Sequence, residues 1–259
     1  MLSHYSLRRA SWEERLDAAV AGGFDGIGVH VRELQRLRAE GWTDATLLAA
    51  ATGRGLEVPE VVLASAWGTG DPAGDEPALR AGEALGAAYV QAIAPIDGAL
   101  VDGVVGFRRL CDQAREAGLA VALEFLPEIS AIEDLSTAAA FVTEAGRDNG
   151  GLCIDVWHFE RGRKDWAALA TVPAERVVMV QLDDGPARRV VDGYLEDCMH
   201  HRCLPGDGVF ELDRFFATLR GSGWEGYVSV EVMDDDLAGL APIDLGRRLG
   251  EASRAALGR

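Results

Sequence analysis

The sequence predicts an α/β protein with the fold of a (β/α)8 TIM barrel. Short runs rich in Val, Ile and Ala alternate with longer amphipathic stretches along the whole chain, which is the pattern of parallel strands joined by helices. Roughly eight such units fit into 259 residues, which matches the usual size of this barrel. An open doubly wound sheet is disfavoured, because no glycine-rich phosphate-binding loop follows the first clear strand.

The predicted strands are short and apolar. An N-terminal segment, HYSL, supplies the first of eight strands if it is counted. The others, in order, are GIGVHV (26–31), VPEVVLAS (58–65), AYVQAIA (88–94), LAVALEFL (119–126), GLCIDVW (151–157), VVMVQLD (177–183) and GYVSVEVM (226–233).

The predicted helices lie between these strands, and several begin at Ser, Thr or Asp and end at Gly, as helix caps do. They are SWEERLDAAVAGG, TDATLLAAATGRG, DEPALRAGEALG, ALVDGVVGFRRLCDQAREAG, IEDLSTAAAFVTEAG, WAALATV and ELDRFFATLRGSG. The glycine-rich GGFDGIG (22–28) precedes a strand, so we interpret it as a helix end and a turn. The longest connection without periodicity, 184–208, has the length of a functional or mobile loop. No linker, low-complexity tract or charge block divides the chain, so we expect one domain over residues 1–259.

The composition narrows the choice of partners. The chain has 42 acidic and 25 basic residues and a formal charge of -17, which repels a phosphate backbone, so we expect no nucleic-acid partner. No signal-peptide pattern and no apolar run of membrane-spanning length is present, so we expect a cytoplasmic protein without a membrane partner. The four cysteines form no CxxC pair and are expected to be free thiols. The oligomeric state, a homo-oligomer included, stays open.

Polar residues close the apolar runs of four successive strands, where a barrel builds its active site. The fifth to eighth strands end in Glu124, in Asp155 and His158, in Gln181 and Asp183, and in Glu231. A single such acid often caps a helix or pairs with an arginine. Several buried carboxylates at one barrel mouth repel each other without a cation, so the set predicts a divalent metal ion. Oxygen ligands favour Mn²⁺ or Mg²⁺, with Co²⁺ and Zn²⁺ as alternatives.

With these residues the sequence resembles the sugar phosphate isomerase/epimerase superfamily, the xylose isomerase-like TIM barrels. The resemblance covers nearly the whole chain. It rests on the motifs LEF, IDVWH and SVEV, on the opening EERLDAAVAGGFDGIGV, and on the late segment RCLPGDGVFELDRFFATLRGSGWEGYVSVEV. These motifs are fairly specific for the superfamily and say little about the substrate.

The resemblance implies four metal ligands, which are Glu124, Asp155, Gln181 and Glu231. Sugar epimerases of the tagatose and psicose type usually carry His at the third position, whereas hydroxypyruvate isomerase-like and dehydroshikimate dehydratase-like members can carry Gln. Asp183 is the alternative third ligand. Alternation along the strand puts it on the same face as Gln181 and leaves Gln181 deeper.

The resemblance also implies groups that face the substrate. His158 completes the family's Asp-x-x-His, and its imidazole could carry a proton; a loop histidine bonded to backbone is the alternative. Arg202 matches the family arginine that holds a substrate oxygen or carboxylate, for which a guanidinium is suited. His30 and Trp67 end the second and third strands, where they either shape the pocket wall or pack in the core.

The predicted function is that of a divalent-metal-dependent isomerase or epimerase, which acts on a small sugar, keto-sugar or related hydroxy-ketone through a metal-stabilised enediolate. Glu124, Glu231 or His158 serves as base and then as acid. The alternative is a metal-dependent dehydratase of the dehydroshikimate or inosose type, since loss of a β-hydroxyl gives dehydration. A non-catalytic barrel subunit is less favoured. An abasic-site endonuclease is disfavoured by the small number of histidines and by the charge.

Overall fold

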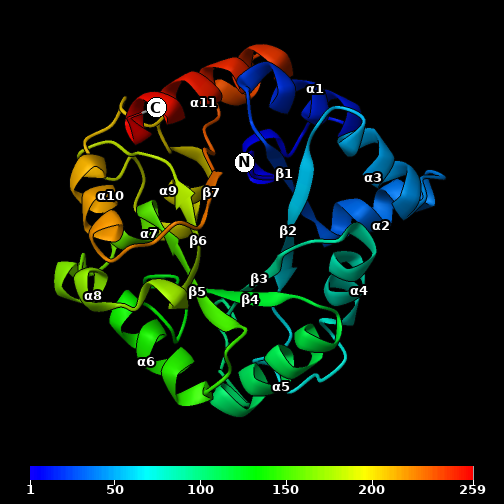
Figure 1. Cartoon of the computed structure of the whole chain (residues 1–259). Helices are drawn as coiled ribbons and strands as arrows, with labels where there is room; N and C mark the ends of the chain where they lie inside the picture. Colours follow the sequence, from blue (N-terminus) through cyan, green and yellow to red (C-terminus); the bar gives the residue numbers. More distant parts are fainter. Residues whose placement is uncertain (259) are drawn as a thin grey trace.

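Residues 1–258 are described by a computed structural model in which parallel strands form an inner barrel and helices form a ring around it (Figure 1). The strands follow one another around the sheet in sequence order, so each neighbour in the chain is also a neighbour in space. They are β1 (Gly26–His30), β2 (Glu57–Ala64), β3 (Tyr89–Ile93), β4 (Ala120–Glu124), β5 (Gly150–Asp155), β6 (Val177–Leu182) and β7 (Tyr227–Val230).

The helices occupy the crossovers and the chain's C-terminal part. They are α1 (Trp12–Gly22), α2 (Val31–Ala39), α3 (Asp44–Thr52), α4 (Glu76–Leu85), α5 (Gly103–Glu116), α6 (Leu135–Ala145), α7 (Val156–Arg161), α8 (Trp166–Thr171), α9 (Tyr194–His200), α10 (Leu212–Gly221) and α11 (Pro242–Leu257). Short 3-10 turns cover Tyr5–Leu7, Ala174–Arg176 and Leu237–Gly239. None of the helices within residues 1–258 is long and apolar enough to cross a bilayer.

The gap between β7 and β1 is filled by the start of the chain. Leu2 pairs in parallel with both Ile27 and Val230. The Leu2 amide donates to the Gly26 carbonyl at 2.9 Å, and the Gly28 amide donates to the Leu2 carbonyl at 2.8 Å. The predicted TIM barrel is therefore confirmed. The eighth strand position is held by residues just before HYSL, because Tyr5–Leu7 form a 3-10 turn.

The seven clear strands of the sequence prediction are present, and each predicted helix stretch contains a helix. The helix α1 begins with a capping box between Ser11 and Glu14. It ends at Gly23, whose φ of 70° suits glycine because other residues are strained in the left-handed region. This geometry confirms that GGFDGIG is a helix end followed by a turn.

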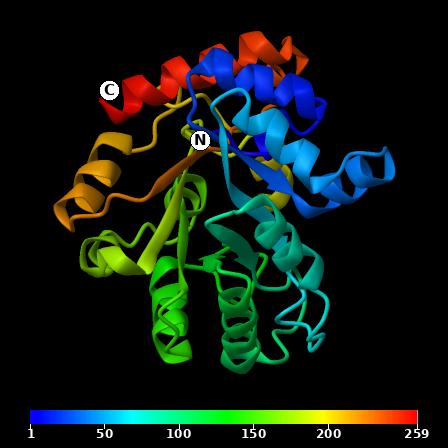
Figure 2. The same cartoon turned by 45° about the vertical axis from the view of Figure 1, so that its right-hand side comes forward.

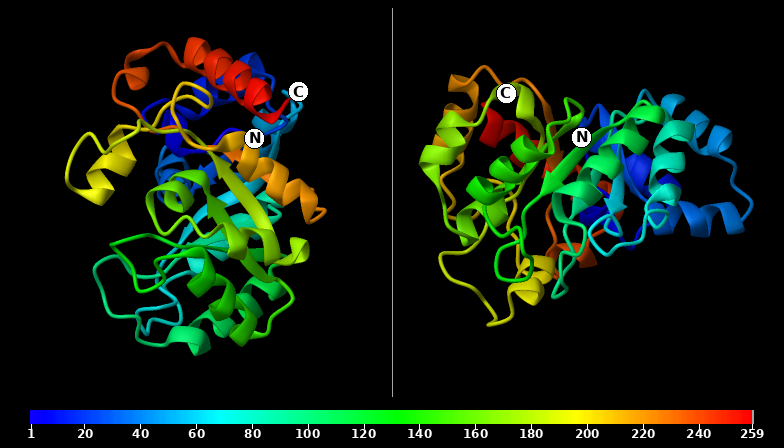
Figure 3. Two further views of the ribbon diagram at one scale, coloured as in Figure 1. Left: turned by 90° about the vertical axis from the view of Figure 1, so that its left-hand side faces the viewer. Right: turned by 90° about the horizontal axis from the view of Figure 1, so that it is seen from below.

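Four helices were not predicted, and two of them shape the site. The helix α7 starts directly after β5, and α9 lies inside the connection predicted as a loop, 184–208. Both are short, so they show little amphipathic periodicity. Figure 3 shows α9 and its flanking segments standing beyond the barrel. The α9 residues Tyr194 and Cys198 border the same cavity as Glu124, which ends β4. The segment 184–208 therefore covers the end of the barrel where the strands finish.

The first and last helices pack side by side. In Figures 1 and 2, α11 runs along α1, so the two ends of the chain complete the helix ring together. Gly246 and Gly250 of α11 face the backbone of α1, where a Cβ atom would overlap the carbonyl oxygens of Ala18 and Gly22. The absence of side chains at these two positions lets the helices approach closely.

Candidate metal centre

The four predicted ligands come together at one end of the barrel. Glu124 ends β4, Asp155 ends β5, Gln181 lies in β6, and Glu231 directly follows β7. Their exposed fractions are between 0 and 5%. Asp155 and Gln181 are direct partners in the register of β5 and β6, so adjacent strands deliver them to the same level of the barrel. The structure thus brings together groups that are far apart in sequence; their metal-binding role stays a prediction.

His158 faces two of these carboxylates. Its Nε2 atom lies 3.0 Å from Glu124 Oε1 and 3.6 Å from Asp155 Oδ2. Ligand atoms of Glu124, Asp155 and His158 all lie within 4.8 Å of one another, which is a spacing compatible with a shared metal ion. His158 is therefore a candidate ligand as well as the predicted proton carrier. Its Nδ1 atom shares a hydrogen bond of 2.6 Å with the Tyr194 hydroxyl.

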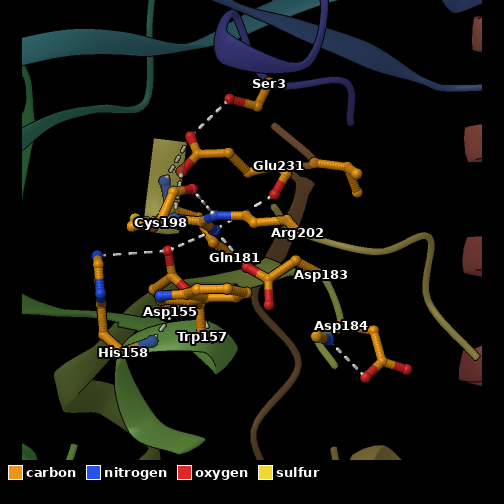
Figure 4. Close-up of polar contacts among 12 residues, drawn as sticks. Ser3, Asp155, Trp157, His158, Gln181, Asp183, Asp184, Cys198, Arg202 and Glu231 are labelled. Atoms are coloured by element: carbon orange, nitrogen blue, oxygen red, sulfur yellow. Dashed lines mark hydrogen bonds and ion pairs between the residues drawn. The ribbon is translucent and has the colours of Figure 1, made fainter. Parts of the chain in front are cut away.

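Asp155 serves the local fold and the site at once. Its Oδ1 atom accepts from the amides of Trp157 at 2.6 Å and His158 at 3.4 Å, so it caps the N-terminus of α7. Its Oδ2 atom faces the site (Figure 4). The motif IDVWH therefore ends a strand, starts a helix and turns His158 back toward Asp155 within one turn.

Gln181 and Glu231 form a second pair. Gln181 Nε2 donates to Glu231 Oε1 at 2.8 Å, and the Ser3 hydroxyl donates to the same oxygen at 2.8 Å. The amide oxygen of Gln181 accepts from the Cys153 thiol at 3.1 Å. To act as the predicted oxygen ligand, Gln181 has to turn its amide so that Oε1 faces Glu231.

Arg202 lies in the middle of the acidic groups (Figure 4). Its Nη1 atom donates to Asp155 Oδ2 at 2.9 Å and to Asp183, and its Nη2 atom lies 3.6 Å from Glu231 Oε2. The Arg202 side chain is 1% exposed. This geometry favours a role in holding the carboxylates, whereas the predicted substrate contact stays untested. Arg202 also binds Asp183, the alternative third ligand. In Figure 4, Asp183 and His158 lie on opposite sides of Asp155.

Electrostatics support a cation at this position. Burial, reinforced by Asp155 and Glu124, raises the pKa of Glu231 to about 8 in spite of Arg202. Burial and the neighbouring Asp155 raise the pKa of Asp183 well above its usual range. Burial also opposes ionisation of Asp155, but Arg202 and His158 outweigh it and hold the pKa of Asp155 below its ordinary value. One guanidinium thus does not balance the carboxylates, and a divalent ion fits the donor set.

A cavity of about 90 Å³ borders this centre. Glu124, His158, Arg202 and Glu231 line it. Other residues around the site were not predicted from the sequence: Ser3, Gln91, Cys153, Tyr194 and Cys198. Gln91 and Cys153 lie inside strands, Ser3 precedes the first predicted strand, and Tyr194 and Cys198 lie on the unpredicted α9. None of them lies at the end of an apolar run, and the predicted site residues were recognised by that position.

His30 and Trp67 are placed differently from the other predicted site residues. Trp67 is buried against Phe107 and Phe141, with ring centroids 5.4 and 5.8 Å away, and its Nε1 atom donates to the Ile93 carbonyl at 2.8 Å. His30 caps α2 through its ring and packs against His4. Among the described residues, neither borders the cavity at the metal centre. Their predicted substrate contact has no support from this geometry and stays untested.

The fold and the site define a class of protein: α/β barrels with a buried acidic centre at the carboxyl ends of their strands. The chain belongs to the xylose isomerase-like TIM barrel family, whose sequence model matches residues 16–255.

Relatives with assigned activities match part of the chain. A 3-dehydroshikimate dehydratase of Pseudomonas aeruginosa is 33% identical over 128 residues, which are 49% of this chain and 20% of the relative. An inosose isomerase of Halalkalibacterium halodurans is 32% identical over 125 residues, which are 48% of this chain and 43% of the relative. The matched region therefore spans about a fifth of the dehydratase and less than half of the isomerase.

Solved structures match the whole fold at lower identity. The IolI protein with a bound zinc atom has a TM-score of 0.88 at 18% identity, with 99% of this chain and 97% of that chain covered. A D-psicose 3-epimerase crystallised in the presence of D-fructose has a TM-score of 0.76 at 18% identity, with 100% and 99% covered. At this identity the likeness establishes the fold alone.

Proposed function

We propose that this chain is a divalent-metal-dependent isomerase or epimerase of a small hydroxy-ketone. The observation that carries the proposal is the buried cluster of Glu124, Asp155 and His158, whose ligand atoms lie within 4.8 Å of one another at one barrel end. Glu231 is linked to this cluster through Arg202, which contacts both Asp155 and Glu231. The named activities of the relatives, an inosose isomerase and a dehydratase, support chemistry next to a ketone. The acidic charge of the chain agrees with a small-molecule substrate and with the absence of a nucleic-acid partner.

The residues that would hold the ion are Glu124, Asp155, Gln181 and Glu231. His158 is an alternative donor through Nε2, and in that case it would no longer carry a proton. When bound, a divalent ion polarises a ketone oxygen and so acidifies the proton on the neighbouring carbon. Mn²⁺ or Mg²⁺ suits the mostly oxygen donors, and an imidazole donor would also suit Co²⁺ or Zn²⁺.

The chain's own residues would move the proton. Glu124 or Glu231 takes it from carbon, and His158 can exchange a proton with Glu124 because Nε2 lies 3.0 Å from Oε1. Tyr194 holds the other ring nitrogen at 2.6 Å and so fixes the orientation of the ring. Return of the proton to the adjacent carbon gives isomerisation, and return to the opposite face of the same carbon gives epimerisation.

Dehydration is the second candidate, because His158 could donate a proton to a departing hydroxyl and a dehydratase is among the relatives. Only this reaction creates a conjugated product. Ultraviolet absorbance on a panel of hydroxy-ketones and ketone acids therefore separates the two candidates.

Metal-stripped protein provides the direct test. With added Mn²⁺ in deuterated water, we expect deuterium to enter a ketose next to its carbonyl, and we expect no exchange without the ion. Glu231→Gln removes one charge of the centre and is expected to lower both Mn²⁺ affinity and exchange by about tenfold or more. Glu60→Gln is the matched control, since Glu60 is an equally buried glutamate inside the barrel. If no ketone exchanged with any of the four metals, enolisation would be rejected.

A further inference from the structure

The cavity at the metal centre contains one guanidinium, and four of its five N–H groups already donate hydrogen bonds, while Nη2 also lies 3.6 Å from Glu231 Oε2. Arg202 Nε donates to the Cys198 carbonyl and Nη2 to the Cys198 sulfur, both at 3.1 Å. Nη1 donates to Asp155 at 2.9 Å and to Asp183. Among the described residues that line the cavity, no other Arg or Lys is found. A substrate phosphate or carboxylate would therefore meet no free guanidinium or ammonium group.

An unused acceptor, in contrast, lies beside the cavity. Gln91 Nε2 donates to Glu124 Oε2 at 2.6 Å. This contact fixes the orientation of the amide, because the reverse orientation would place two oxygens against each other. Gln91 Oε1 is buried and has no hydrogen-bond partner among the described residues. A buried acceptor left alone costs about 1–3 kcal/mol, so a substrate hydroxyl that donates to it is favoured.

The walls and the charge of the cavity point to the same class of substrate. Much of the lining is apolar: Leu63, Ile93, Ile96, Leu126, Ile129 and Met199. Glu124 and Glu231 line the polar side of the cavity. Asp155 and Asp183 do not line it but form ion pairs with Arg202, which does. Arg202 is the one guanidinium among the lining residues that the structure describes, and it is already paired with Asp155 and Asp183. An anionic substrate group away from the ion would lose water there without gaining an unpaired side-chain cation.

From these contacts we infer that the site takes a neutral, hydroxylated ketone, that Gln91 accepts the proton of one substrate hydroxyl, and that ketones carrying a phosphate or carboxylate are rejected. This inference rests on the proposed function and deepens it. It assigns Gln91 as a specificity-determining residue, and it favours rearrangement of a polyol-derived ketone over dehydration of a ketone acid.

The charge preference is measured on matched ketones with the Mn²⁺-loaded full chain. Dihydroxyacetone is compared with its phosphate and with hydroxypyruvate, and D-fructose with D-fructose 6-phosphate, by deuterium exchange followed with NMR. We expect kcat/KM for the neutral member of each set to exceed that of the anionic members by at least about tenfold. Equal or faster exchange of the anionic members would overturn the inference.

The role of Gln91 is measured on two neutral ketones that differ by one hydroxyl. Wild type is expected to prefer dihydroxyacetone over hydroxyacetone, and Gln91→Met is expected to reduce that preference by about tenfold, as for the loss of one buried hydrogen bond. Titration of Mn²⁺ into Gln91→Met shows whether the variant has lost Mn²⁺ affinity because the hydrogen bond to Glu124 is broken. Gln113→Met, on the outer helix α5, is the control and should change neither quantity. An unchanged preference in Gln91→Met would remove Gln91 from the inference.

A binding measurement separates this inference from the proposed function. D-glucitol and D-glucitol 6-phosphate cannot enolise, so calorimetry with both reports the charge preference without any reaction. Tighter binding of D-glucitol, with no exchange on any ketone, would uphold the preference and reject the proposed reaction. Tighter binding of the phosphate would overturn the preference even if ketones exchange. Absence of both binding and exchange would overturn both.

Discussion

Glu60 is a buried carboxylate that the proposed reaction does not use. It lies in β2 inside the barrel and is fully buried. The Tyr89 hydroxyl donates to Oε1 at 3.3 Å and the Ser229 hydroxyl to Oε2 at 3.4 Å. Gly28 on the adjacent strand leaves room for the carboxylate, since a Cβ there would overlap Oε2. Burial raises the pKa of Glu60 from 4.5 to about 7, more than its hydroxyl partners lower it.

This shift predicts a pH-dependent stability. Between pH 4.5 and 7 the folded state keeps a proton on Glu60 that the unfolded chain has released, so the free energy of unfolding falls as pH rises through this window. The loss is on the order of 3 kcal/mol and is complete above pH 7. Glu60→Gln is therefore expected to be more stable than wild type at pH 8, with the difference mostly gone at pH 5.

Urea unfolding of the metal-free protein at the two pH values measures this difference. Glu57→Gln, at an exposed position of the same strand, provides the control and should follow wild type at both. A stability difference between Glu60→Gln and wild type that is the same at pH 5 and pH 8 would contradict the assigned titration.

At the scale of secondary-structure elements, the sequence identifies the strands and the residues that end them. The apolar runs are distinct, and polar residues that interrupt them at Glu124 and Asp155 are costly unless they have a function. Gln91 and Cys153 are harder to recognise, because they lie within strands whose pattern needs no such residue. Tyr194 belongs to a short helix, and its contact with His158 depends on how α9 folds over the barrel. Such contacts come from tertiary packing and leave no mark in local sequence.

The packing of α1 on α11 gives a prediction at this scale. Gly250→Ala places a methyl group where the Gly22 carbonyl lies, so the helices have to separate. We expect a loss of about 1–3 kcal/mol in the free energy of unfolding, measured in urea. Gly221→Ala, at the end of α10, is the matched control because no atom lies within 4 Å of its added Cβ. Equal stabilities for the two variants would show that the close approach carries no energetic weight.

At the scale of the whole molecule, the barrel depends on the first residues of the chain. Leu2 joins β7 to β1 and is fully buried, and the next residue, Ser3, donates to Glu231. Closure of the barrel and the acidic centre are therefore connected through adjacent residues. The apolar pattern of the sequence indicated eight units but placed the closing strand at HYSL, because one paired residue is too short a signal to locate.

Leu2→Ala tests this connection. Removal of the buried side chain is expected to lower the free energy of unfolding by about 2–5 kcal/mol, and to weaken Mn²⁺ binding because Ser3 loses its fixed position. Val105→Ala, on an exposed face of α5, should leave both quantities unchanged. Unfolding in urea and calorimetric Mn²⁺ titration measure the two effects. If Leu2→Ala lowered the stability but left the Mn²⁺ affinity unaltered, the predicted connection between barrel closure and the acidic centre would be wrong.

The segment 184–208, which covers the barrel end, contributes both to the wall of the cavity and to the charge balance of the acidic centre. These two properties could otherwise evolve separately. It contains α9, whose Leu195 and Met199 form part of the cavity wall, and Arg202, the counter-ion of Asp155 and Asp183. Cys198 of the same helix holds the guanidinium. Mutations that reshape α9 for a new substrate also displace the charge that balances the carboxylates. Changes of substrate in this family should therefore be accompanied by compensating substitutions at the acidic centre. Otherwise they should occur by substitution of the cavity-wall residues that lie on strands instead of on α9.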